Sequence, residues 1–93
     1  MMKIIVVCGM GLGSSHFMAM NLIEILKEEG ISAEVENCDL MSAGFKEADI
    51  FMGADYMMDS LENDAEKIGL ENILDKEEIR AKIIERISEN ASR

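Results

Sequence analysis

The sequence predicts an α/β protein, with a four-stranded parallel sheet and helices on both of its faces. Two observations favour this class. Short apolar runs of strand length alternate with longer stretches of helical pattern, and a glycine-rich turn separates the first strand from the first helix. The elements follow the order strand, helix, strand, strand, short helix, strand, helix along residues 1–93, a length that suits a single domain. We expect the strand order 2-1-3-4, with the first strand in a central position.

The first half of the chain has the clearest pattern. Residues 3–7 are, after Lys3, apolar and β-branched, which is typical of a buried strand. Residues 17–29 contain no proline and carry a broad apolar face, so we expect a helix there, ended by Gly30 as its C-cap. Residues 31–38 alternate apolar and polar side chains, which indicates a second, half-exposed strand. The short connection predicts a right-handed βαβ unit.

The second half has weaker signals. Asp75 is expected to begin the last helix, with Glu78 three residues later as in a capping box. The elements expected before it are a loop or short helical turn at 39–47, a buried strand at 48–53, an irregular helix at 54–64 whose Met57 and Met58 fill the core or an interface, and a weak strand at 67–73.

The charge balance limits the kinds of partner. Nineteen acidic and nine basic side chains give a net charge of −10. This argues against binding to nucleic acid, which requires concentrated positive charge, and against direct docking on an anionic membrane surface. No apolar run approaches the length of a membrane span, and the chain opens on a strand instead of a signal peptide. We expect a soluble protein of the cytoplasm, with its two cysteines reduced.

A glycine-rich turn follows the first strand. Residues 8–16 are Cys-Gly-Met-Gly-Leu-Gly-Ser-Ser-His, between the carboxyl end of a strand and the amino end of a helix. Anions bind at such places because unpaired N–H groups and the positive end of the helix dipole converge there. The glycines allow the backbone amides to curl around a tetrahedral oxyanion, and the serines can add hydroxyl donors. The predicted phosphate cradle consists of Gly9, Met10, Gly11, Leu12, Gly13, Ser14 and Ser15.

Cys8 at the start of this turn is the candidate catalytic residue. The helix dipole and the amides that hold a phosphate also stabilise a thiolate, so Cys8 is expected to be a nucleophile that takes up a phosphoryl group. The alternative is that Cys8 is the last buried residue of its strand, since cysteine is among the most buried residue types. Residues 4–21 contain no carboxylate, so the site is locally neutral in an acidic protein. We favour the nucleophile.

Other glycine motifs fit less well. The pattern Gly9-x-Gly11-x-x-Ser14 resembles a dinucleotide fingerprint, but the third glycine is replaced and the chain has no room for a second nucleotide-binding half. The turn is also close to the Cys-x5-Arg-Ser/Thr loop of low-molecular-weight tyrosine phosphatases, with Ser14 where the arginine should be. Without a guanidinium, and with no proline for an Asp-Pro general acid, hydrolysis should be poor. A loop of this kind suits a phosphate carrier.

Residues 4–15 resemble the start of a IIB component of the bacterial phosphoenolpyruvate-dependent sugar phosphotransferase system (PTS). The resemblance is to the ascorbate type, whose loop is Cys-Gly-x-Gly-x-Gly-Ser-Ser and continues into a Met-rich helix, as with Met18 and Met20 here. It implies a fold similar to that of the low-molecular-weight tyrosine phosphatases, related to the Rossmann type. It also implies a relay: a phosphohistidine on a IIA partner loads Cys8, which passes the phosphoryl group to an ascorbate-like sugar held by the membrane transporter IIC.

Two further residues have open roles. His16 is either a surface residue or an auxiliary cation near the phosphocysteine, because histidine titrates near working pH. Cys38 is expected in the core, with a disulfide to Cys8 as the minor alternative. No cofactor or metal is expected, and membrane association is expected only through IIC. The competing functions are a non-catalytic phosphate- or nucleotide-binding regulatory module and a residual phosphatase.

Overall fold

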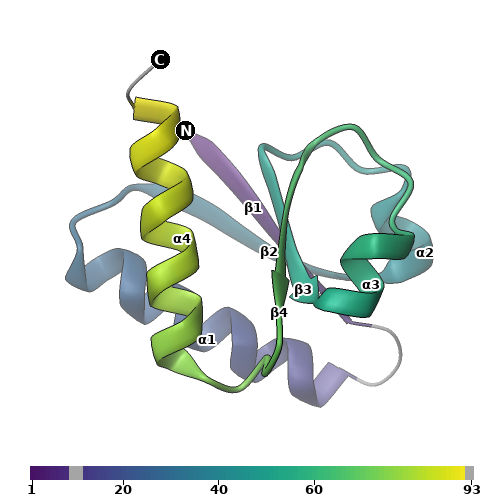
Figure 1. Cartoon of the computed structure of the whole chain (residues 1–93), viewed down its shortest axis with the longest axis horizontal. Helices are drawn as coiled ribbons and strands as arrows, with labels where there is room; N and C mark the ends of the chain where they lie inside the picture. The colour runs from purple at the N-terminus through teal and green to yellow at the C-terminus, as the bar shows by residue number, and fades with distance from the viewer. Residues whose placement is uncertain (9–11, 92–93) are drawn as a thin grey trace.

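A parallel sheet forms the centre of the computed structural model, which describes residues 1–8 and 12–91 (Figure 1). Its strand order is β2-β1-β3-β4, with every neighbouring pair parallel, so the predicted fold class and the order 2-1-3-4 are confirmed. The elements are β1 (Met2–Cys8), α1 (Leu12–Glu28), β2 (Ala33–Asp39), α2 (Leu40–Ala43), β3 (Ile50–Ala54), α3 (Asp55–Ser60), β4 (Glu66–Leu70) and α4 (Lys76–Ala91).

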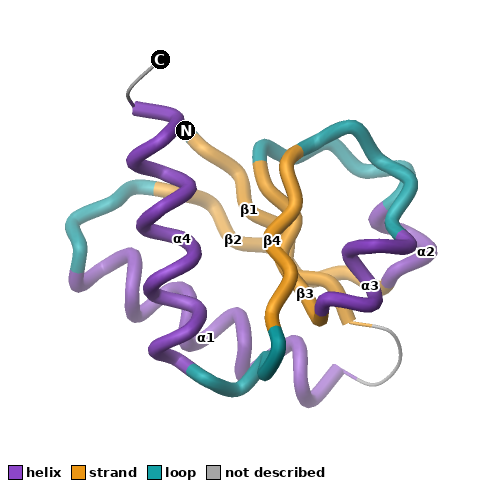
Figure 2. The backbone as a smooth tube through the Cα atoms, viewed as in Figure 1, coloured by secondary structure: helices purple, strands orange, loops and turns teal. Residues whose placement is uncertain are grey.

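Strand β1 is buried on both faces. Its residues Ile4, Ile5, Val6 and Val7 are at most 1% exposed, because helices cover both sides of the sheet. Figure 2 shows α1 and α4 on one side and the shorter α2 and α3 on the other. Ile4 and Val6 belong to the core beneath α1 and α4, whereas Ile5 and Val7 belong to the core beneath α2 and α3. This alternation explains the continuous apolar run in the sequence.

Helix α1 begins at Leu12, five residues before the predicted start at residue 17. The prediction treated the glycines and serines as loop, but the first N–H groups of a helix have no intrahelical partner in any case, and these residue types are favoured near a helix start. The end of α1 agrees with the sequence. Gly30 has φ +68°, its N–H bonds the Lys27 carbonyl at 3.2 Å, and the Ile31 N–H bonds the Leu26 carbonyl at 2.9 Å, which is a Schellman motif.

The predicted elements of the second half are present but shorter. Residues 39–47 contain the last residue of β2 and the four-residue helix α2, and α3 has six residues of the eleven expected. Met57 and Met58 of α3 are buried against the core, which confirms their predicted role as filler. Strand β4 ends at Leu70 instead of residue 73, since the chain turns there toward α4.

The capping box at α4 is half formed. The Asp75 carboxylate accepts from the Glu77 N–H at 3.0 Å and the Glu78 N–H at 3.3 Å, as predicted. The Glu78 carboxylate does not return to Asp75. It accepts instead from the N–H groups of Glu71 at 2.7 Å and Asn72 at 2.9 Å. Glu78 therefore holds the β4–α4 connection against the helix.

Candidate functional site

Cys8 is the last residue of the central strand, at the carboxyl edge of the sheet. It is half-buried, unlike the four fully buried residues before it. This partial exposure argues against the alternative in which Cys8 only fills the core. The predicted cradle residues Gly9, Met10 and Gly11 lie outside the described residues.

The backbone of α1 starts four residues after Cys8, at Leu12. Gly13, Ser14 and Ser15 therefore lie in the first helical turn and not in a loop, and the first turn carries no acidic residue. A helix start offers unpaired N–H groups and the positive end of a dipole, which favour a thiolate or a phosphate nearby. The contacts of the two serine hydroxyls stay predictions.

His16 lies one turn inside α1 and is exposed. Its ring meets that of Phe17 edge to face, with ring centroids 6.3 Å apart and planes at 63°. This agrees with a surface position, and the auxiliary role of His16 stays a prediction.

Asp39 is a neighbour of Cys8 that the sequence analysis missed. Strands β1 and β2 pair in parallel so that Cys8 stands opposite Asp39. Asp39 caps α2, accepting from the Ser42 N–H at 3.3 Å. A hydrogen bond with the Ser42 side chain is the main cause that lowers the pKa of its carboxyl group, and the bond from the Ser42 N–H adds a smaller lowering. Residues 4–21 alone implied a site without carboxylates, but Asp39 places one beside Cys8. The signal that could have found Asp39 is the register of the two strands, whose carboxyl ends must meet at one edge.

Cys38 lies on the other face of the sheet from Cys8. It pairs with Val7, and side chains of successive strand residues point to opposite faces, so a disulfide between Cys8 and Cys38 is excluded. Cys38 is half-buried and packs against the core beneath α2 and α3, so its predicted core position is confirmed in part. Burial raises the pKa of its thiol.

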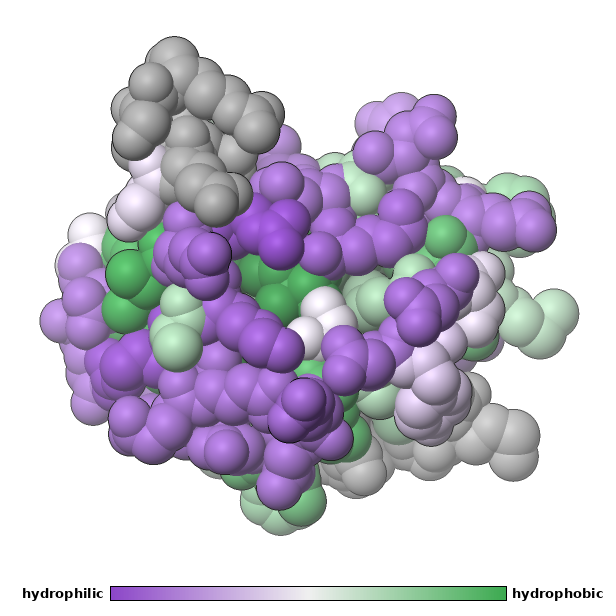
Figure 3. Space-filling model, viewed as in Figure 1, coloured by the Kyte–Doolittle hydropathy of each residue, from purple (hydrophilic) through white to green (hydrophobic). Residues whose placement is uncertain are grey.

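Exposed apolar side chains follow the carboxyl ends of all four strands. Phe17 on α1, Met41 on α2, Tyr56 on α3 and Leu74 before α4 are each more than half exposed. The face that α4 presents is largely hydrophilic by contrast (Figure 3). Apolar surface is thus available at the edge where Cys8 lies, and such surface is typical of protein contacts.

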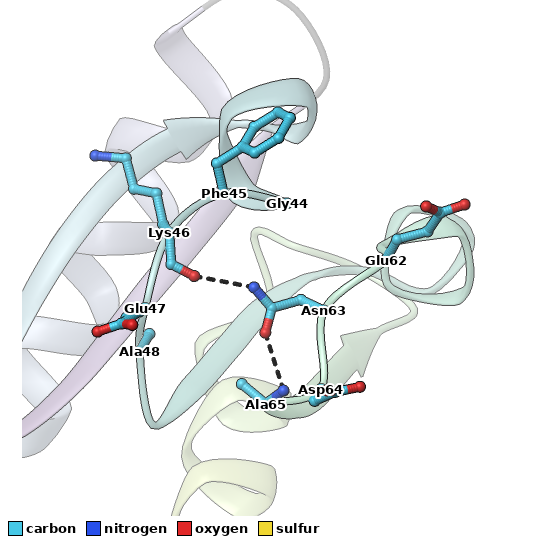
Figure 4. Close-up of a pocket in the computed structure, with 9 residues that line it drawn as sticks. All are labelled: Gly44, Phe45, Lys46, Glu47, Ala48, Glu62, Asn63, Asp64 and Ala65. Atoms are coloured by element: carbon cyan, nitrogen blue, oxygen red, sulfur yellow. Dashed lines mark hydrogen bonds between the residues drawn. The ribbon is translucent and has the colours of Figure 1, made fainter.

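A hollow of about 800 Å³ lies away from Cys8, between the two connections that lead back to the amino ends of β3 and β4 (Figure 4). Asn63 joins these connections, donating to the Lys46 carbonyl at 2.9 Å and the Ala43 carbonyl at 3.2 Å and accepting from the Ala65 N–H at 2.9 Å. The lining of the hollow includes three carboxylates, which disfavour a phosphate there. The residues that line it are Gly44, Phe45, Lys46, Glu47, Ala48, Glu62, Asn63, Asp64 and Ala65.

Among residues 1–8 and 12–91, no helix has both the length and the apolar character needed to cross a bilayer. In the same part of the chain, no three or more histidine, cysteine, aspartate or glutamate side chains are grouped so that they could hold a metal ion.

Comparison with protein-family models decides the family. Residues 3–87, more than nine-tenths of the chain, match the model of the PTS system lactose/cellobiose-specific IIB subunit. The chain belongs to this family. The predicted relationship to PTS IIB components is confirmed, and the ascorbate-type grouping lies within the same IIB superfamily.

Solved structures include a IIB relative with the same fold. The solution structure of the Enzyme IIB subunit of a PTS from Escherichia coli K12 aligns with a TM-score of 0.57 over 98% of this chain and 93% of that one. The two sequences are 20% identical, so this likeness bears on the fold alone. A search of curated proteins gave no match.

Family membership sets the general activity. IIB subunits are phosphotransferase components of a sugar PTS, and they work with IIA and IIC components. This IIB chain therefore takes part in phosphoryl transfer coupled to sugar transport. The candidate within it for that chemistry is Cys8, half-buried at the carboxyl end of β1 and just before α1.

Proposed function

We propose that this IIB chain carries a phosphoryl group on Cys8. The observation that supports the proposal most is the position of Cys8, which ends the central strand four residues before the start of a 17-residue helix. Cys38, the other cysteine, packs on the opposite face of the sheet, beneath α2 and α3, which have four and six residues. Thiolate and phosphocysteine are both anions, and both are stabilised at a helix amino end.

The reaction has two displacements at phosphorus. The Cys8 thiolate attacks the phosphorus of a IIA phosphohistidine, the P–N bond breaks, and the imidazole nitrogen keeps the bonding electron pair. A sugar hydroxyl on IIC then attacks the phosphocysteine, the S–P bond breaks, and the thiolate is restored while the hydroxyl proton passes to solvent. The amides of residues 9–15 and the hydroxyls of Ser14 and Ser15 are the proposed hydrogen-bond donors to the phosphoryl oxygens, and His16 is proposed as an auxiliary cation.

The absence of an arginine from residues 8–16 fits a carrier better than a phosphatase. A bidentate guanidinium stabilises the transferring phosphoryl group during hydrolysis, and Ser14 occupies the position that arginine has in the phosphatase loop. Water should therefore attack the phosphocysteine slowly. The phosphoryl group then persists until the sugar-bound IIC arrives.

For the sugar, we infer an ascorbate-like substrate. The support is the loop Cys-Gly-x-Gly-x-Gly-Ser-Ser at residues 8–15, which resembles that of the ascorbate type, whereas the matching family model is described by lactose and cellobiose. Uptake assays with the cognate IIC decide between them. Phosphorylation of ascorbate and not of cellobiose is expected, and the reverse result would replace the substrate assignment without changing the role of Cys8.

The phosphorylation site is tested by mass spectrometry after incubation with phosphorylated IIA. Cys8→Ala should abolish the phosphoryl adduct, whereas Cys38→Ser, the matched control on the opposite face, should retain it. An adduct that survives in Cys8→Ala, or that maps to Cys38 or His16, would overturn the proposal. We further propose that the protein acts in the cytoplasm and reaches the membrane only through IIC.

A further inference from the structure

The charge next to Cys8 is set by the neighbouring strand. Cys8 and Asp39 are partners in the β1–β2 ladder, so their Cα atoms lie about 5 Å apart, the usual spacing between paired strands. Both residues end their strands at the same edge of the sheet. A carboxylate at this position is within one Debye length of any group carried on Cys8, because that length is about 8 Å at physiological salt.

Asp39 is held in its ionised form. The Ser42 side chain and the Ser42 N–H both bond the carboxylate, and the side-chain bond is the larger cause that lowers the pKa of the carboxyl group despite some opposition from desolvation. The basic side chain that acts on this carboxyl group is Lys46, and it is engaged elsewhere, with its Nζ 2.5 Å from a carboxylate oxygen of Glu36. Lys46 adds only a minor stabilisation of the Asp39 carboxylate.

We propose that Asp39 is a positioning residue whose negative charge opposes loading of Cys8 and thereby favours onward transfer of the phosphoryl group. The inference rests on the proposed function of Cys8. When the thiolate takes a phosphoryl group from histidine, the charge it carries rises from one toward two, and Asp39 repels the added charge. When the S–P bond breaks in transfer to the sugar hydroxyl, that repulsion is relieved. Asp39 thus offsets part of the stabilisation by the α1 dipole, which alone would favour the loaded state.

The size of the effect follows from the spacing. Two unit charges about 6 Å apart interact by an amount equal to a threefold to hundredfold change in an equilibrium constant, for effective dielectric constants between about 80 and 20. Because Asp39 is exposed to solvent, about tenfold is expected. The ratio of phosphorylated to unphosphorylated Cys8 at equilibrium with phosphorylated IIA should therefore rise about tenfold when the charge is removed.

The test uses Asp39→Asn, because asparagine caps helices as well as aspartate and so retains α2 without the charge. The control is Glu34→Gln, which removes an equal charge from the same strand but five residues away, about 16 Å along β2. Both are made in a Cys38→Ser background, so that a single thiol reacts. Circular dichroism and the thermal unfolding midpoint confirm that each variant is folded.

The first readout is independent of phosphotransfer. The anionic sulfonatoethyl and the cationic trimethylammonioethyl methanethiosulfonates both modify thiolates, and the ratio of their rates reports the charge around Cys8. Asp39→Asn should raise the anionic-to-cationic rate ratio several-fold, and Glu34→Gln should leave it unchanged. An unchanged ratio in Asp39→Asn overturns the placement of this charge.

The second readout combines the equilibrium level of phosphocysteine in the presence of phosphorylated IIA and the rate of onward transfer to the sugar. Asp39→Asn should raise the phosphocysteine level and lower the rate of onward transfer. A changed reagent ratio with an unchanged phosphocysteine level overturns the inference about loading. If Cys8 is not phosphorylated in the parent protein, the proposed function fails, and the inference about loading falls with it, whatever the reagent ratio shows.

Discussion

The close approach of β3 to β1 just before Cys8 makes Gly53 an informative position for substitution. A Cβ atom added to Gly53 would lie 2.9 Å from the Val7 carbonyl oxygen and 3.1 Å from the Met58 Cε atom. The methionine methyl can move, since it ends a flexible side chain. The carbonyl cannot move easily, because Val7 belongs to the central strand, which pairs on both sides.

Two opposing contributions set the expected magnitude for Gly53→Ala. Overpacking in a tight core costs about 1–3 kcal/mol. Replacing glycine by alanine restricts the unfolded chain and returns about 0.4–1 kcal/mol. The net loss in the free energy of unfolding should be about 1–2 kcal/mol, and for a chain of this length it lowers the melting temperature by roughly 4–15 °C.

The assay is urea unfolding followed by circular dichroism, with Gly44→Ala as the matched control. Gly44 has φ −61°, and a Cβ there meets no atom closer than 3.7 Å, so alanine should leave stability unchanged or raise it slightly. Because Val7 precedes Cys8, Gly53→Ala should also slow phosphorylation by IIA at temperatures where the protein stays folded. If Gly53→Ala proves as stable as Gly44→Ala, the tight contact with the Val7 carbonyl is refuted.

Three further outcomes are expected. Burial is the largest single influence on the pKa of the Glu78 carboxyl group and raises it, but hydrogen bonds from two backbone N–H groups and a lysine together outweigh burial and lower the pKa, so Glu78→Gln should cost about 1–3 kcal/mol at pH 7. Because the pKa of Glu78 is lower in the folded state than in the unfolded chain, the ionised group stabilises the fold at pH values above the unfolded-state pKa of 4.5. The stability difference between the parent protein and Glu78→Gln should therefore shrink as the pH falls below 4.5, and a constant difference in urea unfolding from pH 7 to pH 3 would contradict this prediction. Asn63→Ala removes two donated hydrogen bonds and should destabilise by about 1–3 kcal/mol in thermal unfolding, while alkylation of Cys8 in the folded protein keeps its rate; an altered rate would link the distant hollow to the site. Phe17 is 59% exposed, so Phe17→Ala should change stability by less than about 0.5 kcal/mol yet weaken IIA binding, and calorimetry showing equal affinity would exclude Phe17 from the docking surface.

Features that depend on neighbours in the sequence could be predicted without the structure. The apolar run at residues 4–7 identified the central strand, because a strand covered on both faces needs no polar positions. Gly30 marked the end of α1 because its positive φ suits a residue without a Cβ atom. Cys8 next to the glycine turn indicated a phosphoryl carrier, and family membership agrees with that class of protein.

Features that depend on which strands pair, and in what register, came only from the tertiary structure. The sequence places Cys8 in a stretch without carboxylates, yet the β1–β2 register sets Asp39 beside it. The same register puts Cys38 on the opposite face, which removes the disulfide alternative. Glu78 has the spacing of a capping box but bonds the β4–α4 connection instead, because the chain turns back within its reach. Local pattern fixes which face of an element is apolar, whereas electrostatics at the site depends on distances of a few ångströms between residues far apart in the chain, and only the packed sheet determines those distances.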